Sequence, residues 1–245
     1  MLYFSHLFIK EVIVVKYLPD SLSEEHKSLQ FLLRANAPAE AVLPVFLSLH
    51  AQLHPGPVSQ TQHTLADALL SGLRPCDFAV MPTAKDETLA WAIWHMARLE
   101  DLSLNLLIAR CEPVLSPLWS RRLGTDVTDT GNAMTDEEIL SFSRAVSPDV
   151  LLEYWAAVGR RTREVAQTLT AQDWRRPADA DGLARIRETG GVTDQPASTF
   201  LVDYWAKKDV AGLLLMPLTR DPMMHLNDCM RLKESLRTKK SFFLQ

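Results

Sequence analysis

The strongest helical pattern in the sequence lies in residues 86–108, which contain no glycine or proline. Apolar side chains recur there at helical spacing and make one broad face, formed by Leu89, Ile93, Met96, Leu99, Leu104, Leu107 and Ile108. Such a face is typical of a helix that packs against a core. We therefore expect this segment to be the second helix of a helical bundle.

Capping residues and proline breaks predict further helices along the chain. They are expected after a capping signature at residues 20–24, and over residues 39–54, 60–70, 135–145, 150–169, 183–188, 197–215 and 221–239. Pro44 is expected to kink or delay the helix over residues 39–54. Because no run of alternating apolar residues is convincing, we predict no β-sheet. The expected fold class is all-α, with bundle helices joined by short connecting helices.

The composition indicates one globular domain. Apolar residues make up 47% and charged residues 23% of the 245 residues, which predicts a buried core. We divide the chain into an extension over residues 1–20 and a single helical domain over residues 21–240. Residues 1–18 are apolar, but three charged side chains interrupt them and no small-residue cleavage site follows. A strand, an extra helix and a poorly ordered extension all stay open for this segment.

Charge and cysteine content exclude several classes of partner. A formal net charge of −4 offers no basic surface for phosphate groups, so we expect no nucleic-acid partner. The apolar start is too short and too charged to span a bilayer, and we expect no membrane association. Cys76, Cys111 and Cys229 are widely spaced and never form a Cys-x-x-Cys pair. This pattern argues against a disulfide framework or a thiolate zinc site and favours reduced thiols in the cytoplasm.

Isolated histidines carry the remaining chemistry, because the sequence has no phosphate-binding loop, nucleophile elbow or His-Glu-x-x-His zinc helix. His95 lies in the middle of the strongest helix, where a buried imidazole needs a partner. Both a core histidine and a metal ligand stay open for His95 and for His225. Cys229, four residues after His225, is expected to be a core side chain rather than a soft ligand. Solvated side chains are expected for three histidines near helix ends or connections, namely His50, His54 and His63.

Two stretches, residues 91–101 (WAIWHMARLED) and 214–227 (LLMPLTRDPMMHLN), resemble motifs of the DinB-like family. The first resembles the second-helix motif of that family, in which a histidine precedes a Glu-Asp pair. The second resembles the start of the last bundle helix, which usually carries two histidines four residues apart. The resemblance covers the order and spacing of helices over most of residues 30–238. It implies a DinB-like antiparallel four-helix bundle.

The family's metal site takes one histidine from the second helix and two from the last. His95 and His225 match two of these positions, and Asp221 stands where the family has the first histidine of the last helix. The resemblance therefore implies a divalent transition metal, Zn²⁺, Ni²⁺ or Fe²⁺, held by His95, His225 and Asp221. Asp221 followed by Pro222 is also an ordinary helix start with an N-cap carboxylate, so both roles stay open.

Members of the family include enzymes that transfer a low-molecular-weight thiol or isomerise a thiol adduct. The resemblance thus implies a metal-dependent S-transferase or hydrolase-like enzyme whose substrate is a small thiol or another small molecule. Glu100 and Asp101 are expected to be solvated, or to lie behind the ligands. The alternative is a non-catalytic bundle with a degenerate metal site that acts through dimerisation or partner binding. A homodimer is also implied, and its interface or the core would take Trp119, Trp155, Trp174 and Trp205.

Overall fold

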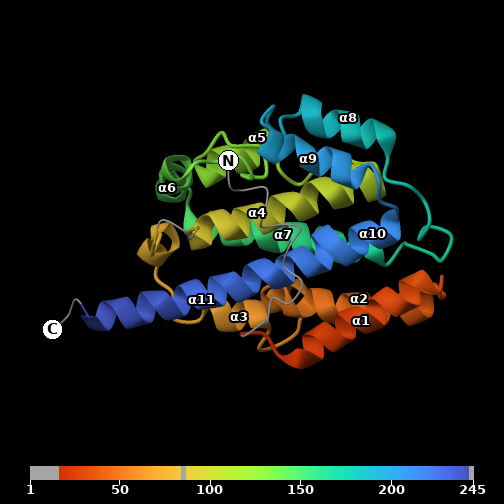
Figure 1. Ribbon diagram of the computed structural model, residues 1–245, viewed down its shortest axis with the longest axis horizontal. Coiled ribbons are helices and arrows are strands. Elements are labelled where there is room, and N and C mark those ends of the chain that lie inside the picture. The colour runs from red at the N-terminus through yellow and green to blue at the C-terminus, as the bar shows by residue number, and fades with distance from the viewer. Residues whose placement is uncertain (1–16, 84–86, 243–245) are drawn as a thin grey trace.

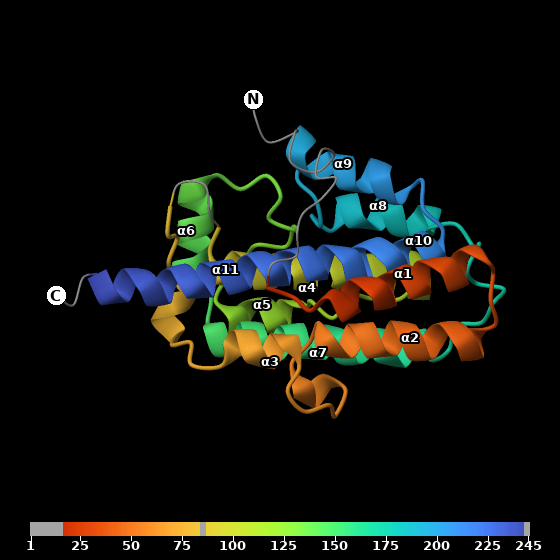
Figure 2. The ribbon, with the colours of Figure 1, turned by 60° about the horizontal axis from the view of Figure 1, so that its bottom comes forward.

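Five long helices pack side by side in a computed structural model, which describes residues 17–83 and 87–242. They are α1, Asp20–Arg34; α2, Ala39–Gln52; α4, Leu89–Leu102; α7, Pro148–Ala166; and α11, Asp221–Phe242. Contacts link α1 to α2, α2 to α7, α7 to α4 and α4 to α11, while α10, Val210–Leu215, contacts α1 and closes the ring. Figures 1 and 2 show these helices running along one axis. The predicted all-α class is confirmed.

Helix α4 lies at the centre of this arrangement, and all 14 of its residues are buried. It begins at Leu89, where the side chain of Thr88 accepts a hydrogen bond from the Trp91 amide. After Leu102 the chain continues as a π-helical segment, Ser103–Ala109. A helix surrounded on all sides also buries its polar residues, and α4 carries four of them: His95, Arg98, Glu100 and Asp101. Since a buried polar group is costly without a partner, these four positions are where functional groups should be sought.

The last bundle helix differs from its prediction at its start. We expected the helix to begin at Asp221, but α10 begins at Val210 after the Asp209 cap and leads into a π-helical turn, Met216–Arg220. Asp221 itself has helical backbone angles, φ −62° and ψ −50°. The π turn takes up Pro217, whose ring does not fit a regular α-helix interior. The α10–α11 unit is therefore continuous, as Figures 1 and 2 show, and Asp221 is not an N-cap.

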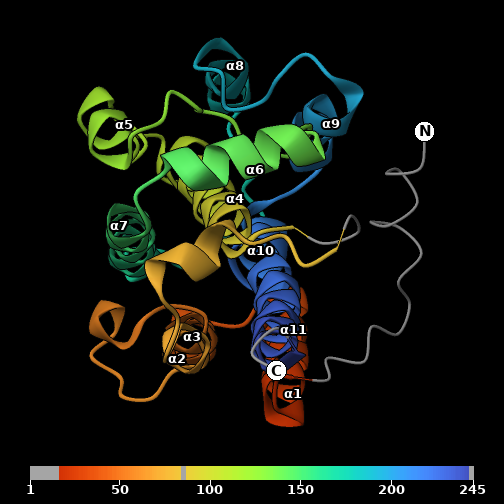
Figure 3. The same ribbon diagram turned by 90° about the vertical axis from the view of Figure 1, so that its left-hand side faces the viewer.

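Shorter helices cover one side of the bundle. Figure 3, which looks along the long helices, shows α5, α6, α8 and α9 on the side of α4 away from α1 and α2. Their bounds are Pro117–Leu123, Asp136–Ala145, Ala180–Glu188 and Pro196–Trp205. Three connecting helices complete the chain: the α-helix α3, Leu65–Leu70, and two 3₁₀ turns, Gly56–Val58 and Pro75–Ala79. Over the described residues there is no β-strand, only an isolated bridge between Pro177 and Asp209.

The tryptophans fill the core. Trp155, Trp174 and Trp205 are at most 1% exposed, whereas Trp119 is partly buried against the same core. Of the two roles left open for these side chains, completion of the core therefore holds for the first three. Most of the predicted N-terminal extension, residues 1–16, lies outside the described residues. No described helix combines the length and apolar character that crossing a membrane requires.

Candidate metal centre

Three predicted ligands meet between α4 and α11. His95 comes from α4, and Asp221 and His225 come from the first turns of α11. One ligand atom from each lies within 4.8 Å of the others, and we call these three residues the open cluster. The Nε2 atom of His225 lies 3.8 Å from Oδ2 of Asp221. The imidazole rings of His95 and His225 meet edge to face, with centroids 4.7 Å apart.

The continuous helix explains why Asp221 reaches His225. Residues four apart in a regular helix lie on the same face, one turn above the other. An N-cap residue would have extended backbone angles and would point its side chain at the helix amides instead. Because the π turn places Asp221 inside the helix, its carboxylate stacks over the imidazole of His225. The structure thus favours the ligand position over the cap for this residue.

A loop fixes the orientation of His95. Its Nδ1 lies 2.7 Å from the carbonyl oxygen of Thr130, and since a carbonyl only accepts, Nδ1 carries the hydrogen. The Nε2 atom then bears the lone pair that a metal requires. The indole of Trp91 stacks on the imidazole of His95 at a centroid distance of 4.8 Å and donates from Nε1 to the Gly131 carbonyl. The predicted partner of this buried histidine is therefore a backbone carbonyl.

Burial sets the protonation states of the open cluster. Removal from water, reinforced by the nearby His225, lowers the pKa of His95 to about 4, so its ring is neutral at pH 7. Burial also raises the pKa of Asp221 to about 6, which leaves the carboxylate mostly ionised at pH 7. Its Oδ2 atom is buried and accepts no hydrogen bond from any described residue. A buried, ionised and unsatisfied oxygen beside two imidazoles is a suitable position for a cation.

The ligand atoms of the open cluster, and their partial exposure to solvent, suit a metal ion that exchanges ligands. Two imidazoles and one carboxylate suit Zn²⁺, Ni²⁺ or Fe²⁺ and leave further coordination positions for a water or a substrate. The side chains of His225 and Asp221 are 18% and 11% exposed, so the cluster opens towards solvent along α11. The predicted set of His95, Asp221 and His225 is therefore brought together with suitable chemistry.

Four other polar residues lie where the sequence did not predict them. His50 and His54 are fully buried rather than solvated, and Glu100 lies between them. Asp101 is buried too, because its carboxylate accepts hydrogen bonds from the backbone amides of residues 114 and 115 and from Arg98. The expectation of solvated side chains holds only for His63, which is exposed. The spacing of His50 and His54, four residues apart, was a signal for a paired role.

Cys229 behaves as a core side chain. It is completely buried, and burial raises the pKa of its thiol far above the ordinary value. A thiol held in its neutral form is a poor metal ligand, since only the thiolate binds transition metals well. This observation supports the core role that was expected for this residue.

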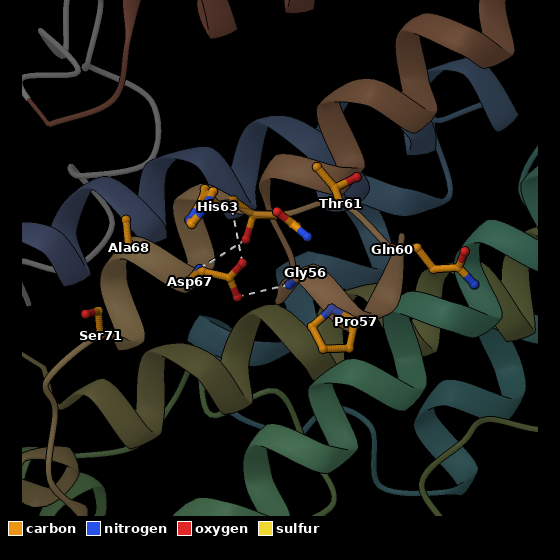
Figure 4. A pocket seen from close by; sticks show the side chains of 10 residues that line it. Gly56, Pro57, Gln60, Thr61, His63, Asp67, Ala68 and Ser71 are labelled. Carbon is orange, nitrogen blue, oxygen red and sulfur yellow. Dashed lines mark hydrogen bonds between the residues drawn. The ribbon is translucent and has the colours of Figure 1, made fainter.

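Two surface pockets are lined by other residues. One, of about 710 Å³, is lined by residues of the loop before α3 and by α3 itself, as Figure 4 shows. There the carboxylate of Asp67 accepts hydrogen bonds from the amides of Gly56 and Thr64, which is a capping role. The second pocket, of about 350 Å³, lies along α6 and the loop before it. Neither pocket is lined by a residue of the open cluster, nor by His50, His54 or Glu100.

No protein-family model matches the chain, and no curated protein matches it.

Proposed function

We propose that this chain is a metal-binding bundle of the DinB-like kind, and that a divalent transition metal at the open cluster makes it an enzyme. Its substrate class would be a small thiol or another small molecule, handled by S-transfer or by a hydrolase-like reaction. Two lines support the proposal: the motif resemblance over residues 91–101 and 214–227, and the geometry of the cluster itself.

One observation carries the proposal. Asp221 and His225 are stacked on one face of a continuous helix, opposite a histidine whose tautomer is set by the Thr130 carbonyl. A hydrogen bond from the outer ring nitrogen to a carbonyl is the usual way in which proteins orient a histidine ligand. The buried Oδ2 of Asp221 accepts no hydrogen bond from any described residue, and a core histidine without a metal role does not explain such an atom.

Each residue of the open cluster has a separate role in the expected chemistry. When bound, the metal would act as a Lewis acid and lower the pKa of a coordinated thiol or water. His95, His225 and Asp221 would hold it, and the single carboxylate would reduce its net charge. The stacked indole of Trp91 excludes water from one side of His95. The exposed edge of His225 leaves the solvent side of the cluster for the substrate.

A titration of the metal-free protein with Zn²⁺ tests the binding step. We expect Asp221→Ser to weaken Zn²⁺ binding by about tenfold or more, or about 1.4 kcal/mol. Asp221→His, which restores the family pattern, should bind at least as tightly as the parent. Asp228→Ser is the matched control, because Asp228 lies on the same helix and its side chain is 38% exposed. Equal affinity in the parent and in Asp221→Ser would remove the third ligand, and a protein without any Zn²⁺ binding would favour the non-catalytic bundle.

A second titration tests the substrate class. The probe is 2-mercaptoethanol added to the Co²⁺-loaded protein, because a thiolate on Co²⁺ adds a charge-transfer absorption band. We expect the band in the parent and in Asp228→Ser, and its loss in the double variant Asp221→Ala, His225→Ala. If Co²⁺ binds at the open cluster but thiol leaves the spectrum unchanged, the thiol-transfer proposal is wrong while the metal site stands.

A further inference from the structure

A second group of two histidines and one carboxylate is buried on another side of α4. His50 lies in α2, His54 lies just after it, and Glu100 reaches them from α4. We call these three residues the closed cluster, because their side chains are at most 1% exposed. His50 Nε2 lies 2.9 Å from Oε1 of Glu100, and His54 Nε2 lies 2.9 Å from Oε2 of the same carboxylate. One ligand atom of each residue lies within 4.8 Å of the others.

The hydrogen bonds around this group leave three buried atoms unsatisfied: Nδ1 of His50, Nε2 of His54 and Oε2 of Glu100. His54 Nδ1 lies 3.2 Å from the carbonyl oxygen of His50, so this nitrogen carries the hydrogen in the neutral ring. The lone pair of Nε2 then faces Oε2 of Glu100, and no hydrogen bond joins these two buried atoms. Two lone pairs at this distance repel one another unless a cation or a proton lies beside them. The other oxygen, Oε1, is already engaged, because it accepts from Thr162 as well as from His50.

The negative charge of Glu100 favours a cation at the closed cluster. Among the described residues no lysine or arginine pairs with Glu100, whose ion-pair partners are His50 and His54. The nearby Arg163 donates instead to the carbonyl of Leu47. A proton on His54 or a bound cation must balance this buried carboxylate, because an uncompensated charge is costly in the interior. A divalent ion would balance that charge and take up the Nε2 lone pair of His54, and His50 would bind it once the hydrogen now donated from Nε2 to Glu100 is released.

The two clusters are separate sites. His95 and Glu100 lie five residues apart on α4, which separates them by about 7.5 Å along the helix axis and by about 140° around it. His95 therefore faces α11, whereas Glu100 faces α2 and α7. The ligands of a bridged two-metal centre would hold ions only about 4 Å apart and would share a carboxylate. No residue belongs to both clusters.

We propose that His50, His54 and Glu100 form a second divalent-metal site, closed to solvent and structural in role. The ion joins the end of α2 to α4, and Thr162 of α7 positions the carboxylate that binds it. The absence of a side chain at Gly159 makes room for this site, because a Cβ there would meet the imidazole of His54. Zn²⁺ or Co²⁺ suits the donor set, and a closed site predicts slow exchange.

The test counts Co²⁺ bound by the full-length protein after refolding in the presence of that metal. The variant Asp221→Ala, His225→Ala removes the open cluster without touching the closed one. We expect about two ions per chain in the parent and about one in this variant, with absorption bands of protein-bound Co²⁺. The retained ion should resist a chelator for as long as the protein stays folded, whereas the ion of the open cluster should leave quickly. A variant that binds no Co²⁺ overturns the proposal, whatever happens at the open cluster.

A further substitution tests whether the retained ion is bound at the closed cluster. In the same double-variant background, Glu100→Gln keeps the size of the side chain and removes its charge. We expect loss of the remaining Co²⁺, while the matched control Glu164→Gln, on an exposed carboxylate of α7, keeps it. An ion that survives Glu100→Gln in folded protein lies elsewhere and contradicts the assignment. If Glu100→Gln does not fold, the count in the double-variant background alone still decides for or against a second ion.

Discussion

The open and closed clusters use the same residue types in different surroundings. Each has two histidines and one carboxylate, each takes one ligand from α4, and in each the other two ligands are four residues apart in the sequence. The open cluster reaches solvent at His225 and Asp221, whereas the closed one is at most 1% exposed. The exposed side chains of the open cluster would let a bound metal exchange its ligands, whereas the buried closed cluster could only hold a metal in place. The proposed functions, catalytic and structural, follow from this difference.

The largest expected effect is at Glu100. Glu100→Ala removes the carboxylate that joins His50 and His54, and it leaves Thr162 without its acceptor. Loss of one member of a buried ionic group costs about 3–5 kcal/mol in the free energy of unfolding. Chemical denaturation would measure it, with Glu164→Ala as the exposed control. A loss below about 1 kcal/mol, as for exposed pairs, would show that the closed cluster is not a buried ionic network.

The opposite sign is expected at Asp221 when no metal is bound. Burial raises the pKa of Asp221 to about 6, above the ordinary 3.8, so the charged form costs stability. The folded protein is therefore most favoured, with respect to this group, below pH 4, and it loses that stability as the pH rises through 6. Asp221→Asn should raise the free energy of unfolding by about 2–3 kcal/mol at pH 8 and by little at pH 4.

Denaturation curves in EDTA at several pH values would test the prediction for Asp221. His95 and Asp221 interact electrostatically, so the difference between the two curves also includes the change that the substitution makes in the pKa of His95. A constant difference across the pH range would contradict the raised pKa. If Asp221→Asn is less stable than the parent at pH 8, the ionised carboxylate of Asp221 stabilises the folded protein, and the prediction is wrong.

A smaller effect is expected at Gly159. Gly159→Ala places a Cβ against the ring of His54 in the closed cluster, and overpacking of a core costs about 1–3 kcal/mol. Gly212→Ala is the matched control in a helix away from both clusters, where the nearest side-chain atom lies 3.2 Å from the added Cβ. Thermal unfolding of the two variants would compare them. Equal melting temperatures would mean that the ring of His54 moves aside freely.

The sequence predicted those parts of the fold that local chemistry controls. The Thr135 capping box opens α6 as expected, and the apolar pattern over residues 86–108 contains the central helix α4, Leu89–Leu102. The break between α9 and α10 was missed, because residues 206–209 contain no glycine or proline. Asp209 is a local cap for the following helix, but the break itself is set by tertiary contacts, since the carbonyl of Lys208 accepts from the Ala178 amide. Such contacts leave no local pattern.

Of the two candidate sites, the sequence predicted the open cluster and not the closed one. The open cluster was found because its residues fall within two recognisable motifs, although the Asp-Pro pair suggested a helix start that the π turn removes. The closed cluster was missed because Glu100 lies fifty residues from His50 and meets it only through the packing of α4 against α2 and α7. A carboxylate in the segment with the strongest helical pattern, together with two histidines four residues apart, was the available signal.

The most direct test of the central claim is the position of a bound metal. Crystals grown with Zn²⁺ should show an anomalous difference peak at the zinc absorption edge within about 2.0–2.2 Å of ligand atoms of His95, His225 and Asp221. The peak should be absent from crystals of His225→Ala grown under the same conditions. A Zn²⁺ peak confined to exposed surface carboxylates, with none between α4 and α11, would contradict the account.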